Sequence, residues 1–298
     1  MPDASAIVDQ LVFGVVYGLL LGCVFALLAH GLNLIWGIAK VVNIAHGEFI
    51  MLGAYGAFFL NLALGFNPII SAAIDAVLGL AVGLSFYFGI LHRELRGKEA
   101  MTPRSEMVTL VATFGLSLFI ANAAKIAWKG DPVGIRWDAG SVDLVAFRIP
   151  LGGVYVAILS VAIIFLTHMF FTRTHLGLAI RAYSQDIPAA QLQGINPTFV
   201  SAFGTSLGFA ATMAGGAFLT VLFPTGINPY MGALYAPICY IIVVLGGPGK
   251  MWGSLVGGLT LGVILHVGQV FLDPSIAAAI AFLTLIPVLL FRPEGILR

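Results

Sequence analysis

Long apolar stretches separated by short polar ones dominate the hydropathy pattern of the chain. A membrane-spanning helix needs about 20 mostly apolar residues, so intervals with few charged side chains locate the spans. Eight segments meet this criterion: residues 10–29, 47–66, 69–91, 107–128, 151–171, 198–222, 252–272 and 276–291. A further helix, residues 231–245, is short for a full crossing. The pattern predicts an all-α polytopic membrane protein with a single transmembrane domain over residues 1–298.

The composition excludes several classes of protein. Of the 298 residues, 60% are hydrophobic and 9% are charged, whereas soluble domains carry about a quarter charged residues. A water-soluble enzyme, a disordered chain and a nucleic-acid-binding protein are therefore excluded. The net charge of +1 predicts no anionic partner. Cys23 and Cys239 lie in separate apolar runs, so neither a disulfide framework nor a CxxC metal site is expected.

Basic residues in the connecting segments predict the orientation. Loops 92–106 and 172–197 carry the Lys and Arg excess that is typical of short cytoplasmic loops. We therefore expect the N-terminus outside and the C-terminus in the cytoplasm, with loop 129–150 outside by parity. No Lys or Arg precedes the first apolar run, which is unlike a signal peptide, and we expect no cleavage.

Small residues recur at four-residue spacing within the spans. They are Gly14, Gly18 and Gly22; Gly79 and Gly83; Gly204 and Gly208; Gly253 and Gly257; and Gly258 and Gly262. Such surfaces allow helix backbones to approach closely in a membrane. Structural packing is the main interpretation, and the alternative is that some of these glycines mark sliding or hinging surfaces of a transporter.

The segment 31–48 is the most polar stretch beside the apolar core. Its apolar pieces are too short to span a membrane, and we predict a partial or discontinuous helix near residues 31–46. Irregular backbone at membrane depth is tolerated only where protein buries it or a cavity lies beside it. Asn43, His46 and Glu48 are therefore candidates for the translocation path of a solute. The alternatives are an ordinary cytoplasmic loop, a packing role for His46, and a Glu48 that only complements the helix dipole.

Enzyme motifs do not fit. His46 and Glu48 have the H-x-E spacing of a zinc deaminase, but no P-C-x-x-C follows. The cluster Gly246–Lys250 lacks both the first glycine of a Walker A motif and the Ser or Thr that follows its lysine. We therefore expect no catalytic site, no metal and no cofactor in this chain, and no ATP hydrolysis by it.

The cytoplasmic loop 172–197 is too long for a simple connector. Asp186 is placed to cap a short helix that has Pro188 in its first turn and ends at Gly194. Ala189 and Ala190 give this helix a low surface that suits docking into a groove of a partner protein. The alternative is a helix that rests on the lipid headgroups.

These residues carry a resemblance to a known family. Ala189-Ala190, three residues and then Gly194 resemble the coupling-loop core of ABC-importer permeases, although Pro188 replaces the acidic residue often found before the alanine pair. Several stretches spread along the chain also resemble the branched-chain amino acid permease family: 31–55, 181–196, 246–258 and 292–296.

The resemblance implies a permease subunit of an ABC importer in a bacterial inner membrane. Its implied partners are a second related permease, two cytoplasmic ATPase subunits and an extracytoplasmic solute-binding protein. It assigns ATPase coupling to Asp186, Ala189, Ala190, Leu192 and Gly194. Relatives of this kind carry branched-chain or other amino acids, urea or amides, or small aromatic acids. The absence of charged residues between Ile187 and Gly249 argues against a highly charged solute.

Two other classes remain as rivals. An ion-coupled secondary transporter would need titrating groups within its spans, and Asp75 and Glu48 are the carboxylates that the sequence offers. An intramembrane enzyme would need a nucleophile with a base, or a set of metal ligands, and the sequence suggests neither.

Overall fold

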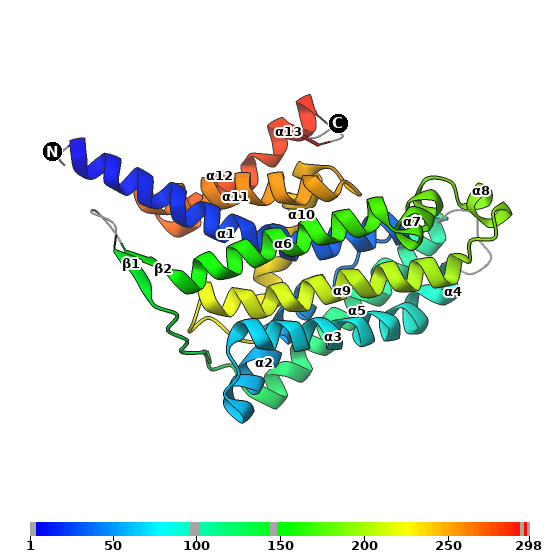
Figure 1. The fold of residues 1–298 in the computed structure, drawn as a ribbon, viewed down its shortest axis with the longest axis horizontal. Helices are drawn as coiled ribbons and strands as arrows, with labels where there is room; N and C mark the ends of the chain where they lie inside the picture. Colours follow the sequence, from blue (N-terminus) through cyan, green and yellow to red (C-terminus); the bar gives the residue numbers. More distant parts are fainter. Residues whose placement is uncertain (1–3, 96–101, 144–147, 293–294, 297–298) are drawn as a thin grey trace.

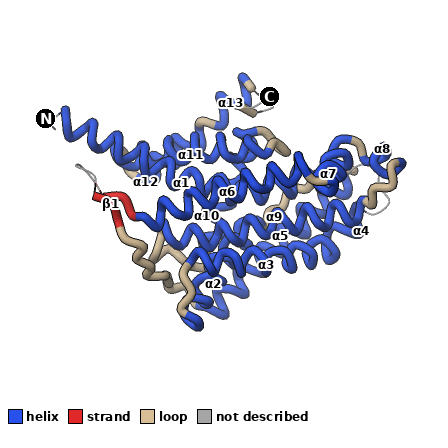
Figure 2. The backbone as a smooth tube through the Cα atoms, in the orientation of Figure 1, coloured by secondary structure: helices blue, strands red, loops and turns tan. Residues whose placement is uncertain are grey.

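The computed structural model describes residues 4–95, 102–143, 148–292 and 295–296. Residues 96–101 of the predicted cytoplasmic loop and the basic residue at position 298 lie outside the described residues. Most of the described chain is helical, and the strands of the described residues form one short antiparallel hairpin (Figure 2). The elements are α1 (Ala4–Ala39), α2 (His46–Leu64), α3 (Pro68–Phe86), the π-helix η1 (Tyr87–Leu91), α4 (His92–Leu95), α5 (Pro103–Trp128), β1 (Ser141–Asp143), β2 (Arg148–Pro150), α6 (Leu151–Arg173), α7 (His175–Gln185), α8 (Ile187–Leu192), α9 (Pro197–Leu222), α10 (Met231–Gly246), α11 (Met251–Phe271), α12 (Pro274–Leu283) and α13 (Leu285–Phe291).

Several helices begin with the same local signal. An Asn, Asp or Thr accepts a hydrogen bond from a backbone N–H of the first turn, and a proline occupies one of the first two helical positions. This arrangement starts α3, α5, α8, α9 and α12, whose capping residues are Asn67, Thr102, Asp186, Asn196 and Asp273. The proline fixes the backbone in a helical conformation and has no N–H that would need a partner. These starts follow from local sequence alone.

Eight helices within the described residues are long and apolar enough to cross a membrane, as predicted. Two of these spans combine shorter elements, since α3 continues through η1 and α4, and α12 continues into α13. Helix α10 is apolar but shorter than a span. The predicted discontinuity falls at residues 40–45, because α1 continues without a break through Gly31 and Gly37.

Helix α9 lies at the centre of the molecule and is the most buried of the spans. It packs against α1, α2 and α3, while α1 also packs along α11 (Figure 1). The glycines are at these contacts: Gly18 and Gly22 of α1 face α11, Gly79 and Gly83 of α3 face α9, Gly204 and Gly208 of α9 face α1, Gly253 and Gly257 of α11 face α10, and Gly258 and Gly262 face α1. The packing interpretation is confirmed, because a methyl group at most of these positions would collide with the facing helix. A hinging role stays a prediction.

The helix order contains an internal repeat of inverted direction. A long helix, a break, a short helix and a returning helix occur first as α1–α2–α3 and again as α9–α10–α11. The two long helices pack antiparallel, with Leu28 facing Gly215 and Ile38 facing Gly204. Each returning helix packs against the long helix of the other repeat, α3 on α9 and α11 on α1. This exchange forms one core from both repeats.

The predicted cytoplasmic segments gather at one end of the molecule. Helices α4, α7 and α8 lie at the end opposite the N-terminus and the β-hairpin (Figure 1). The turn at Gly249 reaches the same end, since Gly249 contacts Gly37 near the end of α1. The backbone N–H of Ile296 bonds to the carbonyl of Leu245, which brings the end of the described chain beside this turn. Which face is cytoplasmic stays a prediction from the basic residues.

Candidate functional site

The break between α1 and α2 is folded into the protein. Asn43 is fully buried, and its side-chain oxygen accepts a hydrogen bond from the Ala45 N–H at 3.1 Å. Its backbone carbonyl accepts bonds from the His46 N–H at 3.1 Å and from the Tyr240 hydroxyl of α10 at 2.5 Å. Residues 41–46 are buried or half-buried, so this segment is not an exposed loop, and the alternative of a cytoplasmic connection stays open.

Two buried polar atoms beside the break have no hydrogen-bond partner among the described residues. They are the side-chain nitrogen of Asn43 and Oε2 of Glu48. Glu48 is only 5% exposed, and its other oxygen accepts a hydrogen bond from Ser117 at 3.1 Å. The carboxylate lies against Gly232 at the start of α10. A buried donor and a buried acceptor without partners are costly unless another polar group meets them. They are therefore suited to contact a polar solute.

His46 is placed differently from the other two path candidates. It is 1% exposed, and its Nε2 lies 3.0 Å from the backbone carbonyl of Leu28 in α1. Because a carbonyl can only accept, this nitrogen carries the proton and donates it to the bond. The contact ties the first turn of α2 to the middle of α1, which fits the alternative of a packing histidine.

Glu48 also occupies the first turn of α2, where a carboxylate complements the helix dipole. That alternative does not conflict with a path role, since only one oxygen of Glu48 has a hydrogen-bond partner among the described residues. Asp75, the second carboxylate within the spans, is fully buried in α3 against Gly56, and neither of its oxygens has a partner among the described residues. Asp75 lies at the contact of α3 with α2, whereas Glu48 faces α5 and α10.

The coupling loop folds as its sequence predicts. Asp186 caps α8 by accepting a hydrogen bond from the Ala189 N–H at 3.0 Å. At the other end Gly194 takes a left-handed conformation, with φ of 78°. The N–H of Ile195 bonds to the carbonyl of Ala190, which completes a Schellman motif. The helix is short and is fixed by both of its caps.

The members of the coupling set face different ways. Asp186, Ala189, Leu192 and Gly194 are exposed, and Leu192 is 87% exposed. Ala190 is 3% exposed and packs in a cluster with residues of α1, α6, α7 and α9, among them Leu34 and Phe171. The two alanines therefore differ in their surroundings: Ala190 packs α8 against the spans, whereas Ala189 and Leu192 form the exposed surface of α8.

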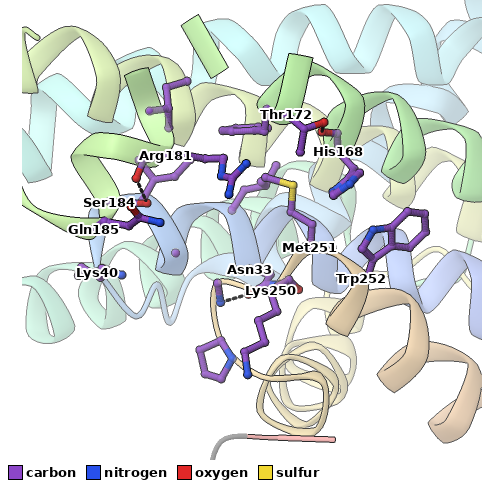
Figure 3. Close-up of a pocket in the computed structure, with 17 residues that line it drawn as sticks. Asn33, Lys40, His168, Thr172, Arg181, Ser184, Gln185, Lys250, Met251 and Trp252 are labelled. Atoms are coloured by element: carbon purple, nitrogen blue, oxygen red, sulfur yellow. Dashed lines mark hydrogen bonds between the residues drawn. The ribbon is translucent and has the colours of Figure 1, made fainter. Parts of the chain in front are cut away.

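A cavity of about 730 Å³ lies beside this loop, between α7 and the ends of α1 and α6 and the start of α11. Three cationic side chains, Lys40, Arg181 and Lys250, belong to its lining, as do His168 and Trp252 (Figure 3). Asn33 of α1 fixes the turn that precedes α11. Its side-chain nitrogen donates to the Lys250 carbonyl, and its side-chain oxygen accepts from the Gly249 N–H.

Sequence reasoning missed both the cavity and two residues that hold the break. Tyr240 and Ser117 bond to Asn43 and Glu48 from α10 and α5, about 197 and 69 residues away in sequence. No spacing pattern indicates such partners. The cavity's cations are likewise far apart in sequence, so only the fold brings them together.

The chain was compared with known proteins. The family described as "branched-chain amino acid transport system / permease component" matches residues 14–289. Among curated proteins, the high-affinity branched-chain amino acid transport system permease protein BraD of Pseudomonas aeruginosa is 29% identical over 310 aligned positions, covering 100% of this chain and 97% of the relative. LivH of Salmonella typhimurium, of the same description, is 28% identical over 293 positions, covering 94% and 93%.

A more distant relative also matches over most of its length. The probable branched-chain amino acid transport permease protein LivH of Methanocaldococcus jannaschii is 25% identical over 284 positions, covering 91% of this chain and 87% of the relative. No solved structure matches the chain significantly. The resemblance noted from the motifs is confirmed by a family match that spans the path candidates and the coupling loop. The chain is a multi-pass membrane protein that belongs to the branched-chain amino acid transport system permease family.

Proposed function

We propose that this chain is the membrane permease subunit of an ABC importer whose solute is a branched-chain amino acid. The family match over residues 14–289 supports the permease role. The names of BraD and LivH, both high-affinity branched-chain amino acid permeases, support the solute. Urea, amides, small aromatic acids and other amino acids are the alternative solutes.

The observation that carries the proposal is the exposed, doubly capped helix α8. Its Leu192 is 87% exposed on a surface outside the predicted spans, where an apolar side chain gains by docking into a partner. Ala190 fixes the same helix to the spans. A push on α8 from ATPase subunits would thus reach α1 and α9. The complete complex would contain a second related permease, two ATPases and a solute-binding protein outside.

The translocation path would pass the break at residues 40–45. Glu48 offers a carboxylate oxygen and Asn43 an amide nitrogen, both buried and without a hydrogen-bond partner among the described residues. A zwitterionic amino acid carries the complementary groups, an ammonium and a carboxylate. The path would close and open as α2 and α10 change their contact at Gly47 and Gly232.

Transport by the reconstituted complex tests the proposal. The chain is expressed with the subunits encoded beside it and placed in proteoliposomes, and uptake of labelled leucine is measured with and without ATP. We expect uptake only with ATP and the ATPase subunits. Uptake driven by an H⁺ or Na⁺ gradient without the ATPases would instead identify a secondary transporter. ATP-dependent uptake of urea or benzoate but not leucine would overturn the solute alone.

A matched pair of variants tests the coupling helix. Leu192→Asp and Gln193→Asp each place one new carboxylate at the exposed end of α8. We expect Leu192→Asp to reduce ATP-dependent uptake at least tenfold while folded yield is kept, because it removes an apolar docking contact. Gln193→Asp should lower uptake less than twofold. Equal effects of the two variants would contradict docking through Leu192.

A further inference from the structure

The cavity beside the coupling loop joins a cationic part to an apolar part. Lys40 follows α1, Arg181 belongs to α7 and Lys250 precedes α11, so three separate elements contribute positive charge. No Asp or Glu is among the described residues that line it. In Figure 3 the Arg181 guanidinium extends into the middle of the cavity, and Lys40 and Lys250 lie toward its margin. The net charge of +1 conceals this cluster, because acidic residues elsewhere in the chain offset it.

The apolar part of the cavity continues onto the membrane-facing surface. Trp252 is 38% exposed, and its ring lies 5.1 Å from the His168 ring and 6.3 Å from the Phe165 ring, measured between centroids. Phe165, Leu166 and Met169 of α6 are each at least half exposed. Tryptophan is enriched at the level of the lipid headgroups. Trp252 at the edge of the cavity is therefore typical of the depth where headgroups meet acyl chains.

We propose that this cavity binds one anionic phospholipid of the adjacent leaflet. The phosphate lies against Arg181, with Lys40 adding attraction, and the acyl chains extend along Trp252 and the exposed face of α6. Basic pockets at the ends of spans are suited to anionic headgroups because charge attraction and apolar contact act together there. A zwitterionic lipid lacks the net charge that the cluster favours.

The bound lipid has a structural consequence for the coupling loop. Helix α7 leads directly into α8 through Asp186, and the lipid would connect α7 to the ends of α1 and α11. It would therefore hold the base of α8 in place against the spans. This inference rests on the chain's place in the membrane and not on its solute, so a failure of the leucine assay leaves it intact.

Lipid binding by the purified complex tests the inference. The complex is delipidated in mild detergent and titrated with phosphatidylglycerol or phosphatidylcholine, with bound lipid counted by native mass spectrometry. We expect tighter binding of phosphatidylglycerol. Arg181→Gln and Lys40→Gln should each weaken it about fivefold, the factor expected for one surface charge, and Arg181→Lys should restore most of the affinity.

Arg173→Gln is the matched control. Arg173 is an exposed cation at the end of α6, next to the lining residue Thr172 but outside the lining. We expect it to bind phosphatidylglycerol as the unaltered complex does. Equal binding of the two lipids, or equal losses in Arg181→Gln and Arg173→Gln, would overturn the inference. Displacement of phosphatidylglycerol by glycerol 3-phosphate at similar concentration would show that a soluble phosphate ligand occupies the site instead.

Discussion

The two breaks of the inverted repeat have the same local geometry and different surroundings. In the first, the Asn43 side chain accepts a bond from the N–H two residues on, and its carbonyl accepts one from the N–H three residues on. Asn228 repeats both bonds, at 2.9 and 3.2 Å. A glycine follows each Asn by four residues, and these two glycines, Gly47 and Gly232, pack on each other.

The difference lies in burial and in the side chains that follow. Asn43 is fully buried, and the first break is followed by buried His46 and Glu48. Asn228 is half-buried, and the corresponding residues Met231 and Ala233 are apolar. The same turn is therefore followed by apolar residues in one repeat and by buried polar residues in the other. An Asn turn between helices is by itself no evidence of a path, because the path role depends on the residues that come after it.

The largest expected effect is on the contact that joins the two breaks. Gly47→Val would place a side chain against the Gly232 backbone, which has no room to move without separating α2 from α10. Overpacking costs about 1–3 kcal/mol and more where backbone is in the way. We therefore expect Gly47→Val to abolish the monodisperse folded fraction seen by size-exclusion chromatography.

Gly115→Val is the control for that experiment. Gly115 lies in α5, where an added Cβ meets nothing within 4 Å. We expect it to fold with unchanged yield. Similar folded yields for the two valine variants would show that the two repeats tolerate separation at this point.

The second prediction concerns the side chain that distinguishes the repeats. Glu48→Gln keeps the shape of the side chain and removes its charge, so a charge-assisted contact to the solute ammonium would be lost. Such contacts contribute about 1.5–3 kcal/mol, and we expect leucine uptake to fall at least tenfold while ATPase turnover stays measurable. Ala233→Gln at the corresponding position should leave uptake within twofold. Unchanged uptake in Glu48→Gln would remove Glu48 from the path.

The third prediction separates two roles of Asn43: its side-chain oxygen stabilises the turn, and its side-chain nitrogen is proposed to contact the solute. Asn43→Ala and Asn228→Ala each remove a side chain that accepts a hydrogen bond from one backbone N–H, which costs about 1 kcal/mol. We expect similar small decreases in melting temperature for both. Only Asn43→Ala should also reduce uptake, by about three- to tenfold, because the Asn43 amide nitrogen has no partner among the described residues, whereas that of Asn228 donates to the Gly226 carbonyl. Loss of transport in both variants would mean that the break geometry, and not the amide, is what transport requires.

The helices were predictable because hydropathy and capping are local properties. The eight spans and the short α10 follow from charge-free intervals, and α8 follows from Asp186, Pro188 and Gly194. The sequence does not show that α1 continues through Gly37. Packing against Gly249 removes the penalty that an isolated helix would suffer there, and that contact depends on the tertiary fold.

The candidate site was predictable only in part, for a related reason. Polar residues beside an apolar run make Asn43, His46 and Glu48 candidates for a path, but they do not show which of their atoms are already bonded. His46 is held by the Leu28 carbonyl and Ala190 faces inward, and both facts depend on helices distant in sequence. The repeat was equally hidden, since its two copies share an Asn and a Gly and little else at the breaks.

The smallest expected effect concerns backbone strain, which the first break has and the second lacks. Lys40, three residues before Asn43, has a φ of 56°. Thr225, three residues before Asn228, is not among the described residues with positive φ. Lys40→Gly should therefore stabilise the protein by about 0.5–1 kcal/mol, since glycine adopts this conformation without a Cβ penalty. Thr225→Gly should destabilise it by a similar amount, because there glycine adds only freedom to the unfolded chain. Thermal unfolding in detergent free of anionic lipid measures both, and shifts of the same sign would mean that Lys40 is not strained.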